Sequence, residues 1–208
     1  MMDKKLKPGY QSLKDLWTVK ESRIRRYMDN HVIPFMLPGI SKCGKYLDVG
    51  EANPRMEYMK GRLGIEVDQF APPDLNFCMA TKTDYYNAIF ALDVLEHLQN
   101  CLLTVRELKK MLKKDGSLYV NLPENACWLW GDEHFFEYRK DHFIKWVIIP
   151  NGLRVERQKK IIFVANWKAF FIGIRPLMRI FLGISTWRSM ARSMFCWNFR
   201  IYEIKKDE

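Results

Sequence analysis

Short apolar runs that end at a glycine, a proline or an acidic residue recur through the middle of the chain and predict buried strands. The first run covers about residues 44–49 and stops at Gly50. Further runs cover residues 63–67, 86–92 and 117–122. Continuous apolar runs of this length, bounded by turn residues, are typical of strands that are covered on both faces in a parallel sheet.

Between these runs, apolar residues three and four positions apart predict helices. The clearest helical pattern covers residues 100–114, has lysines in its last turn and stops before Gly116. A shorter helix is predicted over residues 54–60 and another over residues 139–149. Residues 10–36 also have helical spacing and either pack on the sheet or cover a bound cofactor. Strands that alternate with helices indicate an α/β fold with a doubly wound, mostly parallel sheet.

The C-terminal part of the chain departs from this alternation. Strands are predicted over residues 153–164 and 195–205, and the second suits an antiparallel strand that faces the core on one side. Between them, residues 166–194 are strongly apolar, and all their charged residues are basic. These charges and Pro176 interrupt the segment too often for a spanning helix, which needs about 20 apolar residues. The segment is predicted either to lie in a membrane interface or to pack on the body or in a dimer contact.

The chain is long enough for one sizeable core, and its length of 208 residues fits a single domain. We expect a helical cover over residues 1–43, a sheet core over 44–165, a helical insertion over 166–194 and a closing strand over 195–208. The five cysteines are widely spaced, and no two have the spacing of a metal or redox site. Because the N-terminus is polar and lacks an apolar signal run, a cytoplasmic protein with reduced thiols is predicted.

The positive charge of the chain is concentrated at its ends. The formal net charge is +10, yet residues 31–150 hold fourteen basic and sixteen acidic residues. Residues 151–208 hold twelve basic and four acidic residues, and no carboxylate lies between Glu156 and Glu203. Such a bias suits an anionic membrane surface or a nucleic acid. The sequence contains no recognised RNA-binding module, which favours peripheral membrane contact over nucleic acid.

The stretch from Lys45 to Asn53 joins a strand to a glycine turn. Gly50 ends the first predicted strand, and Asp68 ends the second about twenty residues later. A strand, a glycine turn and an acid at the end of the next strand form the layout of a nucleotide-type site, in which the acid binds ribose hydroxyls. The alternative is a purely structural turn, because Ala52 and Pro54 stand where further glycines would be expected.

Four stretches together resemble the class I S-adenosylmethionine-dependent methyltransferases of the small, single-domain type. They are Tyr46–Glu51, Gly64–Asp68, Tyr86–Leu98 and Leu112–Pro123. The resemblance implies a seven-stranded Rossmann-like sheet with an antiparallel last strand, and S-adenosylmethionine as the cofactor. The chain departs from the family pattern at Ala52–Pro54. It also lacks the second crossover helix, because residues 69–77 are too few and contain a Pro-Pro pair.

The resemblance implies a first group of cofactor contacts around the glycine turn. Gly50 would let the loop approach the methionine part of the cofactor closely. Asp48 would support that loop, and Glu51 would lie beside it. Asp68 would bind the two ribose hydroxyls. These four residues are therefore candidates for binding the methionine and ribose parts of S-adenosylmethionine.

A second group of implied contacts concerns the adenine and the strand over residues 86–92. Asp74 would accept a hydrogen bond from the exocyclic amine of adenine, and Leu75 would offer its backbone N–H. Leu92 and Asp93 would line the cofactor from the end of the strand. With the first group, these residues complete the cofactor site that the resemblance implies.

Two histidines are candidates for a base that removes a proton from the methyl acceptor. His97 follows the carboxyl end of the strand over 86–92, where the acceptor is expected, and alternatively supports the turn there. His134 lies in the aromatic stretch over 124–137 and alternatively anchors that loop. The aromatic stretch and the basic apolar segment favour a small or lipid-linked acceptor near a membrane. The alternative function is a non-catalytic relative of the fold that binds a membrane or a partner.

Overall fold

The computed structural model describes residues 27–51, 54–72, 74–77, 79–125, 140–164 and 196–207. Six strands form one sheet in the order β2-β1-β3-β4-β6-β5. Their bounds are β1 (Tyr46–Val49), β2 (Val67–Phe70), β3 (Tyr86–Leu92), β4 (Leu112–Asn125), β5 (Leu153–Val164) and β6 (Cys196–Lys206). The first four strands are parallel, whereas β6 runs antiparallel to both of its neighbours, β4 and β5.

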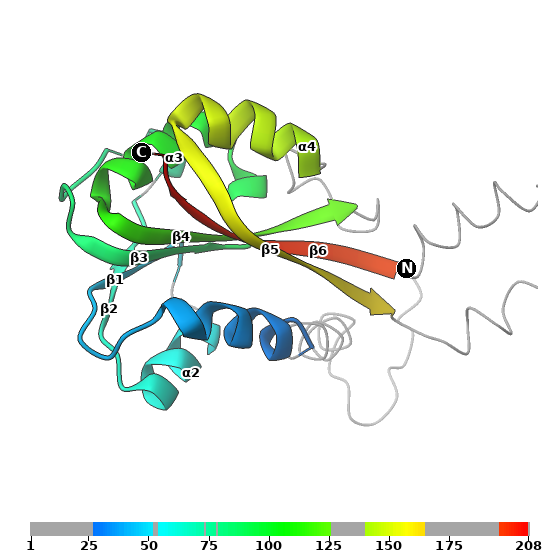
Figure 1. The fold of residues 1–208 in the computed structure, drawn as a ribbon, viewed down its shortest axis with the longest axis horizontal. Helices are drawn as coiled ribbons and strands as arrows, with labels where there is room; N and C mark the ends of the chain where they lie inside the picture. The colour runs from blue at the N-terminus through cyan, green and yellow to red at the C-terminus, as the bar shows by residue number, and fades with distance from the viewer. Residues whose placement is uncertain are drawn as a thin grey trace, which may run out of the picture.

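Helices cover both faces of the sheet (Figure 1). One face carries α3 (Cys101–Met111) and α4 (Lys140–Phe143), which continues as the π-helical η4 (Ile144–Ile148) and the 3-10 turn η5 (Ile149–Asn151). The other face carries α2 (Pro54–Leu63) and a helix over residues 27–36 that ends in η1 (Leu37–Gly39). Two further 3-10 turns, η2 (Leu75–Phe77) and η3 (Leu95–His97), follow β2 and β3.

Alternating residues of the strands supply two hydrophobic cores. Leu47 and Val49 of β1 enter the core under α3, while Tyr46 enters the core under α2 and the helix over residues 27–36. Because both faces are covered, β3 is buried at every position except Asn87. This double burial is the physical reason why β3 reads as a continuous apolar run in the sequence.

The structure confirms the α/β architecture, the mostly parallel sheet and the antiparallel closing strand. The predicted strand over residues 86–92 has the same bounds as β3. Six strands lie within the described residues, so the seventh strand implied by the resemblance is not among them. The link from β2 to β3 contains η2 as its only helical turn in the described residues, in agreement with the predicted loss of the second crossover helix.

The prediction for the second strand was wrong by about four residues. Of the apolar residues in 63–67, Leu63 ends α2, Ile65 lies in the link after it, and only Val67 belongs to β2. Gly64 then has a φ of +63°, and its N–H donates to Lys60 O at 2.9 Å. This left-handed glycine ends the helix, and β2 begins only where pairing with β1 starts, at Val67.

Two further expectations need correction. The helix predicted to reach residue 114 ends at Met111, because Leu112 already belongs to β4. The closing strand was expected to face the core on one side, but residues 201–204 of β6 are all buried. β6 lies between β4 and β5 and is therefore an interior strand of the sheet.

Some predicted segments lie outside the described residues. These are residues 10–26 of the N-terminal helix, residues 126–137 of the aromatic stretch and the insertion over 166–194. Among the helices that the structure describes, none is both long and apolar enough to cross a membrane.

Candidate functional site

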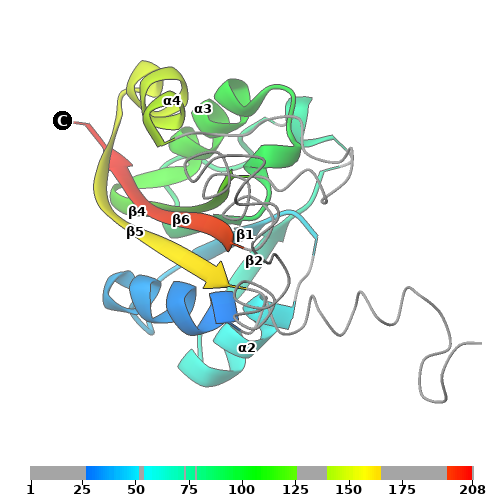
Figure 2. The same ribbon diagram turned by 90° about the vertical axis from the view of Figure 1, so that its right-hand side faces the viewer.

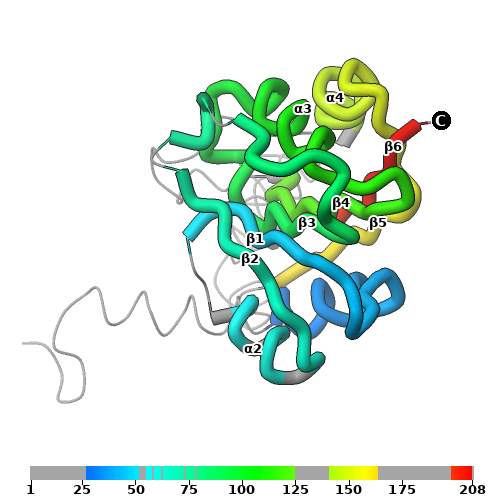
Figure 3. The backbone as a smooth tube through the Cα atoms, turned by 90° about the vertical axis from the view of Figure 1, so that its left-hand side faces the viewer, coloured from blue at the N-terminus to red at the C-terminus, as the bar shows by residue number. Residues whose placement is uncertain are grey.

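The carboxyl ends of β1 and β3 meet where the strand order reverses. From β1 the chain moves to β2 on one side, and β3 then pairs with β1 on the other side. Ligands of open α/β sheets bind outside the carboxyl ends of the strands at such a point. Figure 2 looks onto this edge of the sheet, and Figure 3 looks onto the opposite, amino-terminal edge, where the C-terminus lies.

Gly50 forms the turn directly after β1. Its φ is +105°, and its N–H donates to Phe70 O at 3.0 Å. A Cβ at this position would lie 3.2 Å from Val94 Cγ2, just after β3. The positive φ favours glycine at this position, a Cβ would crowd Val94, and the backbone here is partly exposed.

Asp93 stands directly after β3 with a φ of +58°, which is uncommon for a residue other than glycine. Its carboxylate accepts hydrogen bonds from Arg55 Nη2 at 3.0 Å and from Asn121 Nδ2. Asn121 is completely buried in β4, the next strand of the sheet. A strained backbone with both carboxylate oxygens bonded shows that Asp93 is held in place by its surroundings.

Arg55 connects this acid to the helix over residues 27–36. It lies in the first turn of α2, is 9% exposed, and pairs with both Asp93 and Asp29. Burial disfavours the charge of the guanidinium, but the two carboxylates outweigh burial and hold the pKa of Arg55 above its usual value. Three segments far apart in the sequence are thus joined at one buried cation.

Glu96, in the 3-10 turn after Asp93, is 2% exposed. Burial, and then the nearby charge of Asp93, raise the pKa of its carboxyl well above the usual value. Its Oε2 has no hydrogen-bond partner within the described residues. The edge therefore contains a buried carboxyl group, whose raised pKa follows from its burial and from the nearby carboxylate of Asp93.

Five of the candidate residues from the sequence lie together at this carboxyl-terminal edge. Gly50, Leu92 and Asp93 come from the ends of β1 and β3. Asp74 and Leu75 come from the turn after β2, which docks on the start of α3 through a 2.9 Å hydrogen bond from Thr104 Oγ1 to Leu75 O. The edge thus combines residues from all three neighbouring strand ends.

Asp68 does not lie beside the glycine turn. It is level with Leu47 in the register of β1 and β2, and its Oδ2 accepts hydrogen bonds from Lys82 Nζ at 2.8 Å and Tyr86 Oη at 2.9 Å. Hydrogen bonds from Lys82 and then Tyr86 lower the pKa of Asp68. Tyr86 is the first residue of β3, so these partners draw the carboxylate toward the opposite end of that strand from Asp93.

The β2 side chain that contacts the glycine turn is Gln69. Its Nε2 donates to Gly50 O at 2.5 Å and to Asp48 Oδ2 at 3.3 Å. Asp48 is 1% exposed in β1, consistent with a carboxylate that supports the loop from beneath. Gln69 is therefore placed to fix the turn that the sequence identified.

The remaining candidates divide between the edge and the part of the chain outside the described residues. Glu51 is exposed directly after the glycine turn. His97 is half-buried at the end of η3, and its backbone N–H donates to Val94 O at 3.1 Å. His134 lies outside the described residues.

Sequence reasoning missed four residues of this edge: Gln69, Asn121, Arg55 and Glu96. Gln69 could have been found, because it follows Asp68 and so stands one residue nearer the strand end. Arg55 follows Pro54 at a helix start and reads as an ordinary surface arginine. Only the fold shows that it turns inward to Asp29 and Asp93, which are 26 and 38 residues away in the chain.

Comparisons with known proteins complete this description. No protein-family model matches the chain, and no curated protein does so either. A SAM-dependent methyltransferase structure from Archaeoglobus fulgidus is 15% identical, with a TM-score of 0.58 over 91% of this chain and 93% of that one. The YcgJ protein of Bacillus subtilis is also 15% identical, with a TM-score of 0.56 over 86% and 100% of the two chains.

A third similar structure contains the demethylated cofactor. It is a phosphoethanolamine N-methyltransferase 2 from Haemonchus contortus in complex with phosphomonomethylethanolamine and S-adenosylhomocysteine. It is 11% identical, with a TM-score of 0.57, and the match covers 87% of this chain and 53% of that one. At these identities the likeness concerns the fold. The chain has the fold of the class I S-adenosylmethionine-dependent methyltransferases.

Proposed function

We propose that the protein is an S-adenosylmethionine-dependent methyltransferase that binds its cofactor at the carboxyl ends of β1 and β3. One observation carries this proposal: an open glycine turn with a φ of +105° at Gly50 adjoins the fixed carboxylate of Asp93 where the strand order reverses. The structures with the same fold support it, since they include a SAM-dependent methyltransferase.

The chemistry of the edge fits this cofactor. S-adenosylmethionine supplies an electrophilic methyl group on a cationic sulfonium, and it also carries an ammonium group and two ribose hydroxyls. The edge offers bare backbone at Gly50 and the carboxylate of Asp93. Asn121 Oδ1 is a buried acceptor without a hydrogen-bond partner in the described part of the chain. Acceptors and negative charge suit a ligand that is rich in donors and positive charge.

Within this site we assign the contacts by their position. The methionine part would lie against Gly50 and Glu51, with Asp48 holding the loop. The adenine would lie at Asp74 and Leu75, and Leu92 and Asp93 would line the cofactor between them.

The ribose contact has two candidates from β2. Asp68 has the required acid, but Lys82 and Tyr86 already bond to it. Gln69 adjoins the glycine turn and can both donate and accept. We expect Asp68→Asn to weaken cofactor binding if the carboxylate turns from Lys82 to the ribose. A loss confined to Gln69→Ala would instead assign the ribose to Gln69.

The proton acceptor proposed for the transfer is His97, with His134 as the second candidate. His97 follows the end of β3, where an acceptor bound next to the cofactor would lie. Replacement by glutamine would lower turnover and leave cofactor binding unchanged. Equal turnover of the His97→Gln variant and the unaltered protein would show that His97 is not the proton acceptor.

For the acceptor we propose a small or lipid-linked molecule at a membrane surface. The support is in the sequence: an aromatic stretch over 124–137 and an apolar segment over 166–194 whose charges are all basic. A vesicle flotation assay that compares the whole chain with a 166–194 deletion tests the membrane part. Equal flotation of the two proteins would contradict it.

Calorimetric titration with S-adenosylmethionine tests the proposed function. Gly50→Ala adds a Cβ to the strained turn, and we expect binding to be weaker by about tenfold or more. Gly61→Ala is the matched control, because a Cβ there meets nothing within 4 Å. We expect the control to bind like the unaltered protein. Absence of binding heat with the unaltered protein would refute the proposal, and so would equal binding by the two variants.

A further inference from the structure

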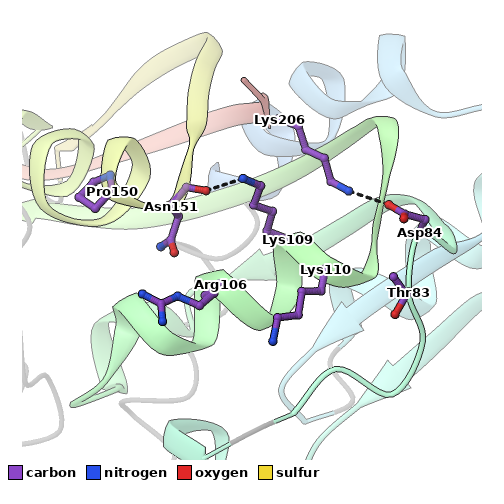
Figure 4. A pocket seen from close by; sticks show the side chains of 8 residues that line it. All are labelled: Thr83, Asp84, Arg106, Lys109, Lys110, Pro150, Asn151 and Lys206. Carbon is purple, nitrogen blue, oxygen red and sulfur yellow. Dashed lines mark hydrogen bonds and ion pairs between the residues drawn. The ribbon is translucent and has the colours of Figure 1, made fainter. Parts of the chain in front are cut away.

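A cavity lies at the other, amino-terminal edge of the sheet. A cavity of about 420 Å³ is formed where the turn before β3, the second half of α3, η5 and the end of β6 come together (Figure 4). Its lining residues are Thr83, Asp84, Arg106, Lys109, Lys110, Pro150, Asn151 and Lys206. The turn before β3 and the end of antiparallel β6 belong to the amino-terminal edge. This cavity is therefore separate from the site at Gly50 and Asp93.

Cations dominate the lining of this cavity. Arg106, Lys109 and Lys110 project from α3 at positions i, i+3 and i+4, and Lys109 points toward Asn151 whereas Lys110 points away from it (Figure 4). Lys206 approaches from β6 and bonds to Asp84, the single acid of the lining, at 2.7 Å. Four like charges gathered around one cavity repel one another, and a bound anion would relieve that repulsion.

These cations keep donors available for a ligand. Lys109 Nζ donates to Asn151 O at 2.7 Å, and Lys110 Nζ donates to Glu107 Oε1 at 2.7 Å. Each ammonium has three N–H donors, so one such bond leaves others free. Within the described residues, Arg106 forms no ion pair. The site thus combines a guanidinium without an ion pair in the described residues with two ammonium groups that keep further N–H donors for a ligand.

The backbone positions Lys109 at this cavity. Gly152 has a φ of +60°, and a Cβ there would lie 2.9 Å from Lys109 Nζ. Asn151 is buried, and its Nδ2 donates to Val147 O at 2.9 Å and to Leu102 O at 3.2 Å. Its own carbonyl is thereby fixed as the acceptor for Lys109. The lysine is thus held by the carbonyl of Asn151, and the positive φ of Gly152 favours glycine in the turn beside it.

We propose that this amino-edge cavity binds a phosphate-bearing ligand with at least two negative charges. Lysine ammonium groups bind phosphate as point charges, and an arginine fork bonds two of its oxygens. The volume of about 420 Å³ lies within the range of small-ligand sites. A soluble diphosphate is one source of this chemistry. An anionic lipid headgroup is the other, because Trp146 and Ile149 beside Pro150 are 62% and 63% exposed.

Charge-matched variants of the full chain test the proposal. We expect calorimetry to show binding of inorganic pyrophosphate and Arg106→Glu to weaken it by about tenfold or more. Lys114→Glu is the control, since it makes the same charge change at an exposed residue outside the cavity. Lys109→Met, which removes the held lysine, should act like Arg106→Glu. Thermal melts of all variants establish that each is folded.

A second arm identifies the source of the phosphate. The same proteins are sedimented with vesicles of phosphatidylcholine, with and without phosphatidylserine. Vesicle binding that needs phosphatidylserine and Arg106 assigns a lipid headgroup, whereas pyrophosphate binding without it assigns a soluble ligand. No Arg106-dependent binding in either arm would overturn the proposal, as would equal losses in Arg106→Glu and Lys114→Glu. S-adenosylmethionine binding is measured separately, so failure here leaves the methyltransferase proposal intact.

Discussion

The two edges of this sheet differ in how their charged groups are buried and paired. At the carboxyl-terminal edge, ionisable groups are buried and bonded to one another: Arg55 is 9% exposed between Asp29 and Asp93, and Glu96 is 2% exposed beside them. At the amino-terminal edge, lysines and Arg106 stand around an open cavity, and Lys110 is 54% exposed. At one edge a buried cation and a buried acid lie among partly exposed carboxylates, whereas at the other edge cations line a cavity.

This difference has physical consequences. Buried charges cost solvation and must be compensated by partners, so their removal changes stability strongly. Exposed charges are screened by water and salt, so their removal changes stability little but alters the binding of ions. The carboxyl-terminal edge is thus a fixed site, whereas the amino-terminal edge is suited to attract anions. Substitutions that separate stability from binding can test the comparison.

The largest effect on stability is expected at Arg55. Arg55→Met leaves Asp29 and Asp93 without their shared cation and should lower the free energy of unfolding by about 3 kcal/mol. This value is at the low end for breaking a buried ion pair, because both acids are partly exposed. Urea unfolding at neutral pH measures the loss. Lys60→Met, on the same helix, removes an exposed pair with Glu57 and should cost less than about 0.5 kcal/mol. Similar losses in the two variants would contradict the difference between buried and exposed charge.

An intermediate and pH-dependent effect is expected at Glu96. Because its pKa is raised in the folded protein, the folded state holds a proton that the unfolded chain releases as the pH rises above about 4.5. Glu96 therefore lowers the free energy of unfolding progressively from that pH up to its raised pKa. Glu96→Gln should remove this loss. The free energy of unfolding of the variant should therefore increase relative to that of the unaltered protein as the pH rises.

Unfolding curves across the acidic to neutral range measure this gain. Glu57→Gln is the matched control, because Glu57 is 65% exposed on α2. Its stability difference from the unaltered protein should change little over the same range. A difference for Glu96→Gln that does not grow with pH would show that the carboxyl is ionised in the folded state at no cost.

The smallest effect on stability is expected at the amino-terminal edge. Lys206→Ala breaks the pair with Asp84, whose side chain is 64% exposed, and should cost at most about 1 kcal/mol. The same substitution should weaken pyrophosphate binding, because it removes one of the cavity's cations. A stability loss comparable with that of Arg55→Met would place this edge among the buried, structural sites.

The sequence predicted local features of the fold better than pairings between distant segments. β3 was located to the residue because its apolar run is buried on both faces and stops at Asp93. β2 was misplaced because the end of α2 is also apolar. The start of the strand is decided by its pairing with β1, and no local sequence pattern contains that information. The glycine turn was identified because Gly50 directly follows an apolar strand.

The charge network of the site could not be predicted in the same way. Arg55 meets Asp29 and Asp93 only because the first turn of α2 packs between the sheet edge and the helix over residues 27–36. The basic cavity likewise joins residues from 83 to 206. An arginine or a lysine has the same appearance in a sequence whether it is exposed or held in such a network.

Hydrogen exchange with and without S-adenosylhomocysteine tests the central claim most directly, because it reports where the cofactor binds. We expect slower exchange at the backbone amides of residues 49–51, 74–76 and 92–97, around the carboxyl ends of β1 and β3. Residues 83–84, 106–110 and 204–206 at the amino-terminal edge should exchange as before. Protection confined to the amino-terminal edge, or no protection anywhere at saturating ligand, would contradict a cofactor site at Gly50 and Asp93.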